Sequence, residues 1–186
     1  MAAARLALHG PDMLWGAIST EYDSFDDLPA RVIRLTPDTL GQVDGLLYLS
    51  SAAWDADRQA ALNAALAGRV LPVVVANPDL VAPREDGLSQ EPGLFAHDLA
   101  DATGLAPAFF GKPFGDAYAD VKARLGPMDW SRVAMVGDTL HTDVLGGAAA
   151  GLKTVLVARH GLFAGCDVQG YIDRCGIVPD YIVQTT

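Results

Sequence analysis

The sequence has little cysteine, little positive charge and no long apolar run, and each shortage excludes a class of protein. Its two cysteines, Cys166 and Cys175, have a spacing that fits no zinc or redox motif, so we expect two reduced or buried thiols. Lysine and arginine total 13 against 23 aspartates and glutamates, which gives a net charge of −10 and a pI near 4.6. Such an acidic chain disfavours contact with a phosphate backbone, so we expect no nucleic-acid partner.

Long apolar runs are also missing. No stretch approaches the ~20 apolar residues that a membrane-spanning helix needs, so we expect no membrane partner. Residues 1–15 lack the apolar core of a secretory signal, and we therefore expect a cytoplasmic protein. The 186 residues suffice for one large or two small domains, and 51% hydrophobic residues are ordinary for a packed globular protein.

What the sequence does contain is an alternation of short β-like apolar runs and helical periods, which predicts an α/β protein with a mostly parallel sheet. The runs LPVVVAN, RVAMVGD and KTVLVAR are almost continuously apolar, as in strands that are covered on both faces. The expected strands are 31–35, 45–50, 71–76, 133–136, 154–158 and 181–184. The expected helices are 55–66, 92–103, 114–125, a segment that starts near residue 139, and a weaker one over 167–175.

A domain boundary is expected near residues 104–111. Before it, the segment ANPDLVAPREDGLSQEPG, residues 76–93, is predicted as a long loop rich in proline, glycine and acids, and loops of this length usually serve a site. After it, the chain is expected to run strand–helix–strand with short connections. The sequence therefore predicts two regions, 1–105 and 106–186.

Two carboxylates stand where an apolar strand runs into a helix, in MVGDTLHTDVLGG over residues 135–147. Ligand sites of open α/β sheets lie at the carboxyl ends of strands, and Asp138 falls at such an end. A carboxylate there can bind a hard divalent cation such as Mg²⁺, and Asp143 can support that ligand or accept from backbone N–H groups. On spacing alone, a plain helix cap formed by Asp138 or Thr139 is favoured.

Lys112 lies between a glycine and a proline immediately before a helix, in FFGKPFGDAY. A fixed ammonium group at the mouth of a sheet suits a phosphate or carboxylate charge. The alternative is an exposed surface lysine, which a lone lysine usually is. Each of these two features is a weak signal alone. Their order is more specific: Lys112 comes first, one amphipathic helix follows, and the two carboxylates come after it.

With this pattern the chain resembles the haloacid dehalogenase (HAD) superfamily of phosphotransferases, and in particular its subclass with a large α/β cap, which includes p-nitrophenylphosphatase-like enzymes. GKPFGDAY resembles the third motif of the family, and GDTLHTDVLGGAAAGLKTVLV resembles the fourth motif with the strand that follows it. VVVANPDLVAP resembles the stretch in which the cap returns to the core, and EPGLFAHDLADATG resembles the helix before the third motif. The resemblance runs from Gly45 to Gly161.

The resemblance implies a three-layer, Rossmann-like α/β fold with a parallel sheet. Residues 1–105 would form the cap, which decides substrate specificity, and residues 106–186 would form the C-terminal part of the HAD-like core. The implied activity is that of a magnesium-dependent phosphatase, which acts on a small phosphorylated metabolite through an aspartyl-phosphate.

The resemblance also assigns roles to single residues. Asp138 would bind Mg²⁺, and Asp143 would sit beside it as a water-mediated ligand or as a support. Lys112 would neutralise the nucleophile and the transferred phosphoryl group. Asn77 and Asp79 would face the substrate from the cap.

The first two motifs of the family are not found in the sequence. The nucleophile of the family is an aspartate at the end of the first strand, in an Asp-x-Asp pattern, but the only such pattern here, Asp55 and Asp57, opens an alanine-rich helix. We expect Asp55 to cap that helix. We therefore expect a fragment that is inactive alone. The alternatives are a degenerate member kept as a binding or assembly module, and a site completed by another chain, for instance in a homo-oligomer.

Overall fold

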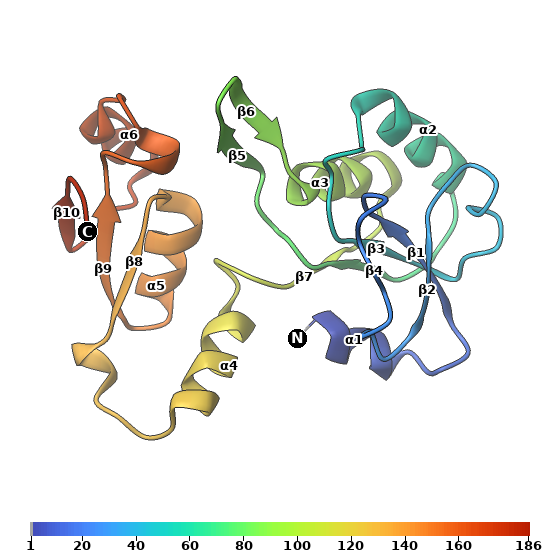
Figure 1. Cartoon of the computed structure of the whole chain (residues 1–186), viewed down its shortest axis with the longest axis horizontal. Helices are drawn as coiled ribbons and strands as arrows, with labels where there is room; N and C mark the ends of the chain where they lie inside the picture. Colours follow the sequence, from blue (N-terminus) through green and yellow to red (C-terminus); the bar gives the residue numbers. More distant parts are fainter. Residues whose placement is uncertain (1) are drawn as a thin grey trace. The chain divides into compact units, whose positions relative to one another are not determined.

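The computed structural model describes residues 2–186, and the chain divides into two compact units, Met1–Phe110 and Gly111–Thr186 (Figure 1). The first unit reaches past residue 105 because the short strand β7 (Ala108–Phe109) pairs with β4 (Val73–Val75). The predicted α/β class with a mostly parallel sheet is confirmed in both units. Within the described residues, no helix combines the length and the apolar character needed to cross a membrane.

The first unit is built on a five-stranded, wholly parallel sheet in the order β2-β1-β3-β4-β7. Its remaining strands are β1 (Leu14–Ile18), β2 (Arg31–Arg34) and β3 (Gly45–Tyr48). Its helices are α1 (Ala2–Leu8), α2 (Ala56–Leu66) and α3 (Pro92–Thr103). A separate antiparallel hairpin joins β5 (Val81–Arg84) to β6 (Gly87–Gln90), within the segment that the sequence predicts as a loop.

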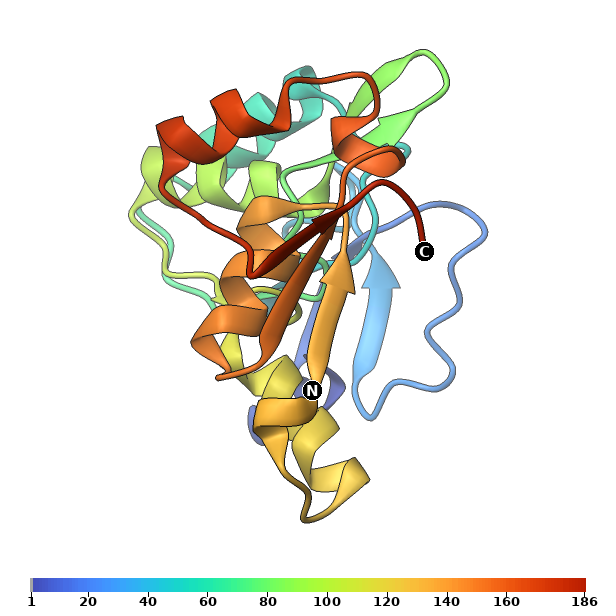
Figure 2. The ribbon, with the colours of Figure 1, turned by 90° about the vertical axis from the view of Figure 1, so that its left-hand side faces the viewer.

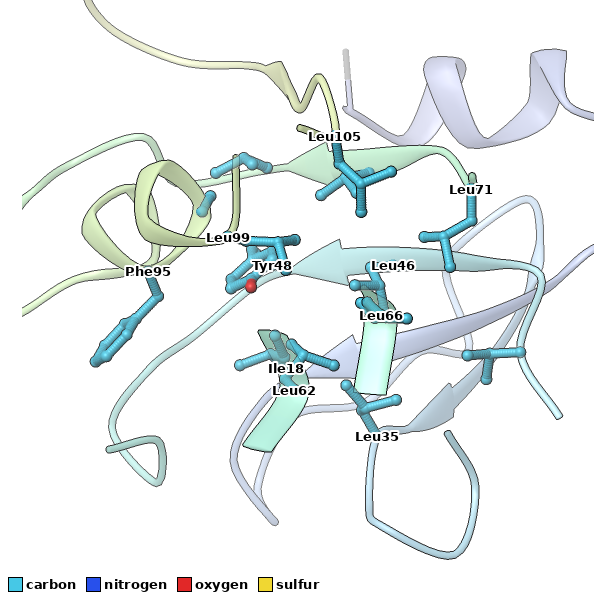
Figure 3. Packing of buried hydrophobic residues seen from close by; sticks show 14 residues of the cluster. Ile18, Leu35, Leu46, Tyr48, Leu62, Leu66, Leu71, Phe95, Leu99 and Leu105 are labelled. Atoms are coloured by element: carbon cyan, nitrogen blue, oxygen red, sulfur yellow. The ribbon is translucent and has the colours of Figure 1, made fainter. Parts of the chain in front are cut away.

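Apolar side chains cover both faces of this sheet. On one face, α2 and α3 pack on a cluster that includes Tyr48, Leu66 and Leu99 (Figure 3). On the other face, a second cluster is built around Leu47 and Val74. Successive residues of β3 and β4 alternate between the two clusters, because successive side chains of a strand point to opposite faces. The run LPVVVAN is therefore buried on both faces, as its composition predicts.

The second unit has a three-stranded parallel sheet in the order β10-β9-β8 (Figure 2). Its strands are β8 (Ala134–Gly137), β9 (Lys153–Val157) and β10 (Tyr181–Val183). Its helices are α4 (Gly115–Leu125), η1 (Trp130–Arg132), η2 (Leu140–Val144), α5 (Leu145–Ala149), η3 (Gly161–Phe163) and α6 (Val168–Cys175). One apolar cluster, which includes Leu140, Leu156 and Ile172, joins η2, β9 and α6.

The prediction that the apolar runs of the second unit are covered on both faces is wrong for one row of the sheet. Val136 pairs with Val155, and Val155 pairs with Tyr181, so the three residues lie in one row across the strands. Val136 is 47% exposed and Tyr181 is 58% exposed, whereas Leu156, the next residue of β9, is fully buried. An apolar composition shows that a strand can be buried, but the packing of neighbouring elements decides whether it is.

Candidate functional site

The turn between β8 and η2 brings the two predicted carboxylates to one place. η2 is a π-helix, in which the N–H groups of Asp143 and Val144 both donate to the carbonyl oxygen of Thr139, at 3.1 and 3.2 Å. Such wide turns are rare and are often found at functional sites. This turn folds the Asp143 side chain back to the end of β8, where a Cβ on Gly137 would overlap its carboxylate. Glycine is therefore required at the end of the strand.

Asp143 and Lys112 form an ion pair in the second unit. The Lys112 Nζ lies 2.5 Å from the Asp143 Oδ1, and the other carboxylate oxygen accepts from the Thr139 N–H at 3.2 Å. The Asp143 side chain is 3% exposed, whereas that of Lys112 is 46% exposed. A buried carboxylate needs such partners to offset its lost hydration. Asp143 therefore fixes the ammonium group at one point, while nearly half of the Lys112 side chain stays exposed.

Asp138 is held by the loop that follows β9. One carboxylate oxygen accepts from the Leu162 N–H at 2.9 Å, and the other is 3.4 Å from the Thr139 hydroxyl. Gly161 has a φ of +70°, and a Cβ there would overlap the Asp138 carboxylate. The second oxygen of Asp138 is therefore only weakly engaged within the protein and keeps lone pairs available for a ligand.

Tyr118 supports the turn from α4. Its hydroxyl donates to the carbonyl oxygen of Thr142 at 3.4 Å, and its ring packs so closely on Gly146 that a Cβ there would overlap it. Burial, and secondly the charge of Asp143, raise the pKa of Tyr118 above its ordinary value, so the phenol stays protonated. Sequence reasoning placed Tyr118 on a helix but gave it no part in the site.

The donor set fits a hard divalent cation only in part. Carboxylate oxygens are the ligands that Mg²⁺ prefers, and the ion usually keeps several waters and binds one or two protein carboxylates. Asp138 has one oxygen whose only hydrogen bond is a long one, at 3.4 Å from the Thr139 hydroxyl, whereas the two oxygens of Asp143 accept from Lys112 and from the Thr139 N–H. Over residues 2–186 there is no group of three His, Cys, Asp or Glu side chains that could hold a metal ion. The roles of Asp138 as a metal ligand and of Asp143 as its support therefore stay predictions.

The structure places Asn77 and Asp79 in the first unit, after β4. The Asn77 side-chain oxygen accepts from the Asp79 N–H at 3.1 Å, and its amide nitrogen is 3.5 Å from the Glu91 carboxylate. Glu91 is buried and also accepts from Ser89 at 2.6 Å and from Arg84 at 2.9 Å. Asn77 thus helps to hold the base of the β5–β6 hairpin, and the substrate-facing role of Asn77 and Asp79 stays a prediction.

The Asp-x-Asp pattern lies at the start of a helix. Asp55 is the N-cap of α2, and its side chain accepts from the Arg58 N–H at 2.8 Å. Asp57 lies in the first turn of the same helix, where a negative charge is favoured by the helix dipole. The expected capping role of Asp55 is confirmed.

The family model that the sequence matches covers almost only the second unit. Residues 109–185 match a family model described as HAD-hydrolase-like. An acid sugar phosphatase of Staphylococcus aureus is 38% identical over 81 residues, which cover 44% of this chain and 31% of the relative. The chain thus spans about a third of the length of the curated relatives that it matches.

The fold matches solved structures over both units. A possible sugar phosphatase of the HAD superfamily from Cytophaga hutchinsonii has a TM-score of 0.79 and 25% identity, over 98% of this chain and 68% of that one. A p-nitrophenyl phosphatase from Archaeoglobus fulgidus has a TM-score of 0.75 and 25% identity, over 98% of this chain and 68% of that one.

Proposed function

Because the chain belongs to the haloacid dehalogenase superfamily, as its motifs predict, we propose that it carries the lysine and the metal-binding carboxylates of a magnesium-dependent phosphatase for small phosphomonoesters. The observation that carries this proposal is the Lys112–Asp143 ion pair at the carboxyl end of β8, in the same turn as Asp138. The names of the relatives, acid sugar phosphatase and possible sugar phosphatase, support a sugar phosphate as the substrate.

Each residue of the proposed site has a physical task. Phosphoryl transfer spreads negative charge over several oxygens, so a fixed cation lowers the barrier by stabilising that charge. Lys112 supplies such a cation, and Asp143 keeps it in place. Asp138, supported by Asp143, would hold Mg²⁺, which would supply further positive charge to the phosphoryl oxygens.

The attacking group is the part that we do not assign to the described residues. An aspartyl-phosphate route needs a carboxylate that attacks phosphorus. The Asp-x-Asp pair of this sequence is engaged at the start of α2 rather than at the end of a strand. We therefore infer that residues 2–186 alone do not turn over phosphate esters. The same observation favours the second candidate, a non-catalytic binding or assembly module.

Mg²⁺-dependent binding of inorganic phosphate to the full chain, measured by calorimetry, tests the proposal. We expect Lys112→Met to weaken phosphate binding by about tenfold or more, because a hydrogen bond to a charged group is lost. Lys153→Met is the matched control, since Lys153 also pairs with a carboxylate in the second unit, at 3.1 Å from Asp180. We expect Asp138→Asn to remove the dependence on Mg²⁺.

Several outcomes would contradict parts of this proposal. Equal losses in the two lysine variants, or no effect of Mg²⁺, would overturn the phosphatase assignment. Robust hydrolysis of p-nitrophenyl phosphate that is abolished by Asp138→Ala would support a phosphatase but overturn the inference of inactivity. Saturable binding of another ligand or chain without any phosphate binding would favour the binding module.

A further inference from the structure

Strand β8 forms one edge of the three-stranded sheet of the second unit (Figure 1). Among the strands of residues 2–186, it pairs with β9 alone. The Lys153 N–H donates to the Val133 carbonyl oxygen at 3.0 Å, and the backbone groups of successive residues in a strand point alternately to its two sides. The N–H and C=O groups of Ala134 and Val136 therefore point away from β9, to the open side of the sheet.

The open side of β8 lacks the features that protect most edge strands. Natural edges are commonly interrupted by a charged residue, a proline or a bulge. β8 reads Ala-Met-Val-Gly, and its register with β9 is unbroken. Ala134 is exposed, and Val136 is 47% exposed. The opposite edge strand, β10, is one residue shorter and directly follows Pro179 and Asp180. β8 is therefore the edge that is more accessible to an added strand.

The charges that flank β8 are opposite in sign and equally spaced. Arg132 precedes the strand and Asp138 follows it, each three residues from Met135, and the five residues between them are uncharged. Arg132 is exposed and forms no ion pair within residues 2–186. One oxygen of Asp138 has only the long hydrogen bond to the Thr139 hydroxyl, at 3.4 Å. Both charges can therefore pair with a further chain.

A second copy of β8 fits this edge when the two strands run antiparallel. About a two-fold axis at Met135, Ala134 of each copy lies opposite Val136 of the other, and each such pair can exchange both of its N–H···O bonds. In the same register, Arg132 of each copy lies opposite Asp138 of the other, so opposite charges meet at both ends of the paired strands. A parallel arrangement would instead place like charges together. The segment thus complements itself in one orientation.

We propose that β8 is the interface of a homodimer, in which two copies of the chain join the sheets of their second units edge to edge and antiparallel. Two four-residue strands bury less than the roughly 1,600 Å² of a stable protein interface, so the dimer is weak and depends on protein concentration. Each copy carries a net charge of −10, so dimerisation also needs salt to screen the repulsion. The proposal does not depend on phosphatase activity or on a bound metal.

Analytical ultracentrifugation of the full chain, in EDTA and about 0.15 M salt, tests the dimer. We expect half of the chain to be dimeric at about 100 µM protein. Val136→Pro removes an outward N–H group but no hydrogen bond to β9, so it should weaken dimerisation about tenfold or more. Ile182→Pro is the matched control on the opposite edge, because the neighbouring Val183 carbonyl oxygen accepts from the Ala158 N–H of the sheet at 2.8 Å. It should leave the dimer unchanged.

A charge variant and hydrogen exchange test the same pairing without a proline in the strand. Arg132→Glu should weaken dimerisation about tenfold, because it places two carboxylates together at each end of the interface. Arg159→Glu, which makes the same charge change at another exposed arginine of the second unit, should not. The amides of Ala134 and Val136 should exchange more slowly at about 1 mM protein than at about 10 µM, whereas that of Met135, which faces β9, should not change.

These measurements separate the β8 interface from other assemblies and from misfolding. Circular dichroism checks that each variant is folded; if Val136→Pro is not, Arg132→Glu and the exchange rates decide. The proposal is overturned if the original chain stays monomeric up to about 1 mM. It is also overturned if the dimer persists in the β8 variants, if the matched controls weaken it equally, or if Ala134 and Val136 gain no protection. Loss of Mg²⁺-dependent phosphate binding would contradict the phosphatase proposal alone, because the dimer is measured in EDTA.

Discussion

The central strands of the first unit are buried along their length, whereas the central strand of the second unit is only partly covered. All four residues of β3 and all three of β4 are buried, but β9 has three buried residues of five. The residues that match the HAD-hydrolase-like family model nevertheless lie almost wholly in the second unit. There, hydrogen bonds from side chains to backbone groups fix single carboxylates, as at Asp138 and Asp143. Two apolar clusters, one on each face of the sheet, hold the first unit, whereas the second unit has a single and smaller one.

A pair of identical substitutions measures this contrast most directly. Val74→Ala removes methyl groups that are 1% exposed, whereas Val136→Ala removes methyl groups in a side chain that is 47% exposed. We expect the first change to lower the free energy of unfolding by about 2–3 kcal/mol and the second by less than about 1 kcal/mol. Native-state hydrogen exchange of the amides in β3 and β9 reads each unit separately. Similar losses in the two variants would show that the row of Val136 is covered in solution.

A pair of glycines tests how tightly the second unit holds Asp138. Gly161 and Gly165 both have positive φ, +70° and +76°, so alanine strains the backbone at either position. Only at Gly161 would the added Cβ overlap the Asp138 carboxylate. We expect Gly165→Ala to destabilise the second unit by about 1 kcal/mol and Gly161→Ala by about 2 kcal/mol. Amide NMR should show a displaced Leu162 signal in Gly161→Ala alone; equal effects would mean that Asp138 moves aside freely.

The sequence predicts those elements of the fold that carry local signals. The helix Pro92–Thr103 has the predicted bounds, because proline opens it and Gly104 closes it in the left-handed conformation. The hairpin β5–β6 was not predicted, because a proline and a run of acids in residues 83–86 are typical of a loop. β7 has two residues and depends on pairing with β4 across a long stretch of sequence. Such pairings leave no local pattern.

For the candidate site, the sequence predicts side chains but not their backbone partners. The motifs name Lys112 and Asp143, which the structure joins in an ion pair. The N–H groups of Thr139 and Leu162 complete the hydrogen bonding of the two carboxylates, and every residue type except proline carries such a group.

The smallest expected effect is a loss of stability at low pH, caused by protonation of Asp180 beside strand β9. Asp180 accepts from the N–H of Thr154 at 2.8 Å and from its hydroxyl at 3.0 Å, and pairs with Lys153 at 3.1 Å. The Thr154 N–H, followed by Lys153, lowers the pKa of Asp180 below its ordinary value of 3.8. A lowered pKa in the folded state means that the ionised carboxylate stabilises the fold above the unfolded pKa, and that this stability is lost as the pH falls through the folded pKa.

In Asp180→Asn, the free energy of unfolding of the second unit should therefore fall less steeply as the pH is lowered. The pH dependence of the first unit should not change. Urea unfolding between about pH 6 and about pH 2, followed by amide signals of β9 and β3, measures this difference. Asp120→Asn is the control, because Asp120 pairs with Arg124 on the exposed side of α4 at 2.8 Å and bonds to no strand. We expect the control to keep the steeper acid dependence of the original chain. If Asp180→Asn keeps it as well, the polar contact at the start of β9 contributes nothing measurable to the second unit, and its thin apolar cluster alone accounts for its stability.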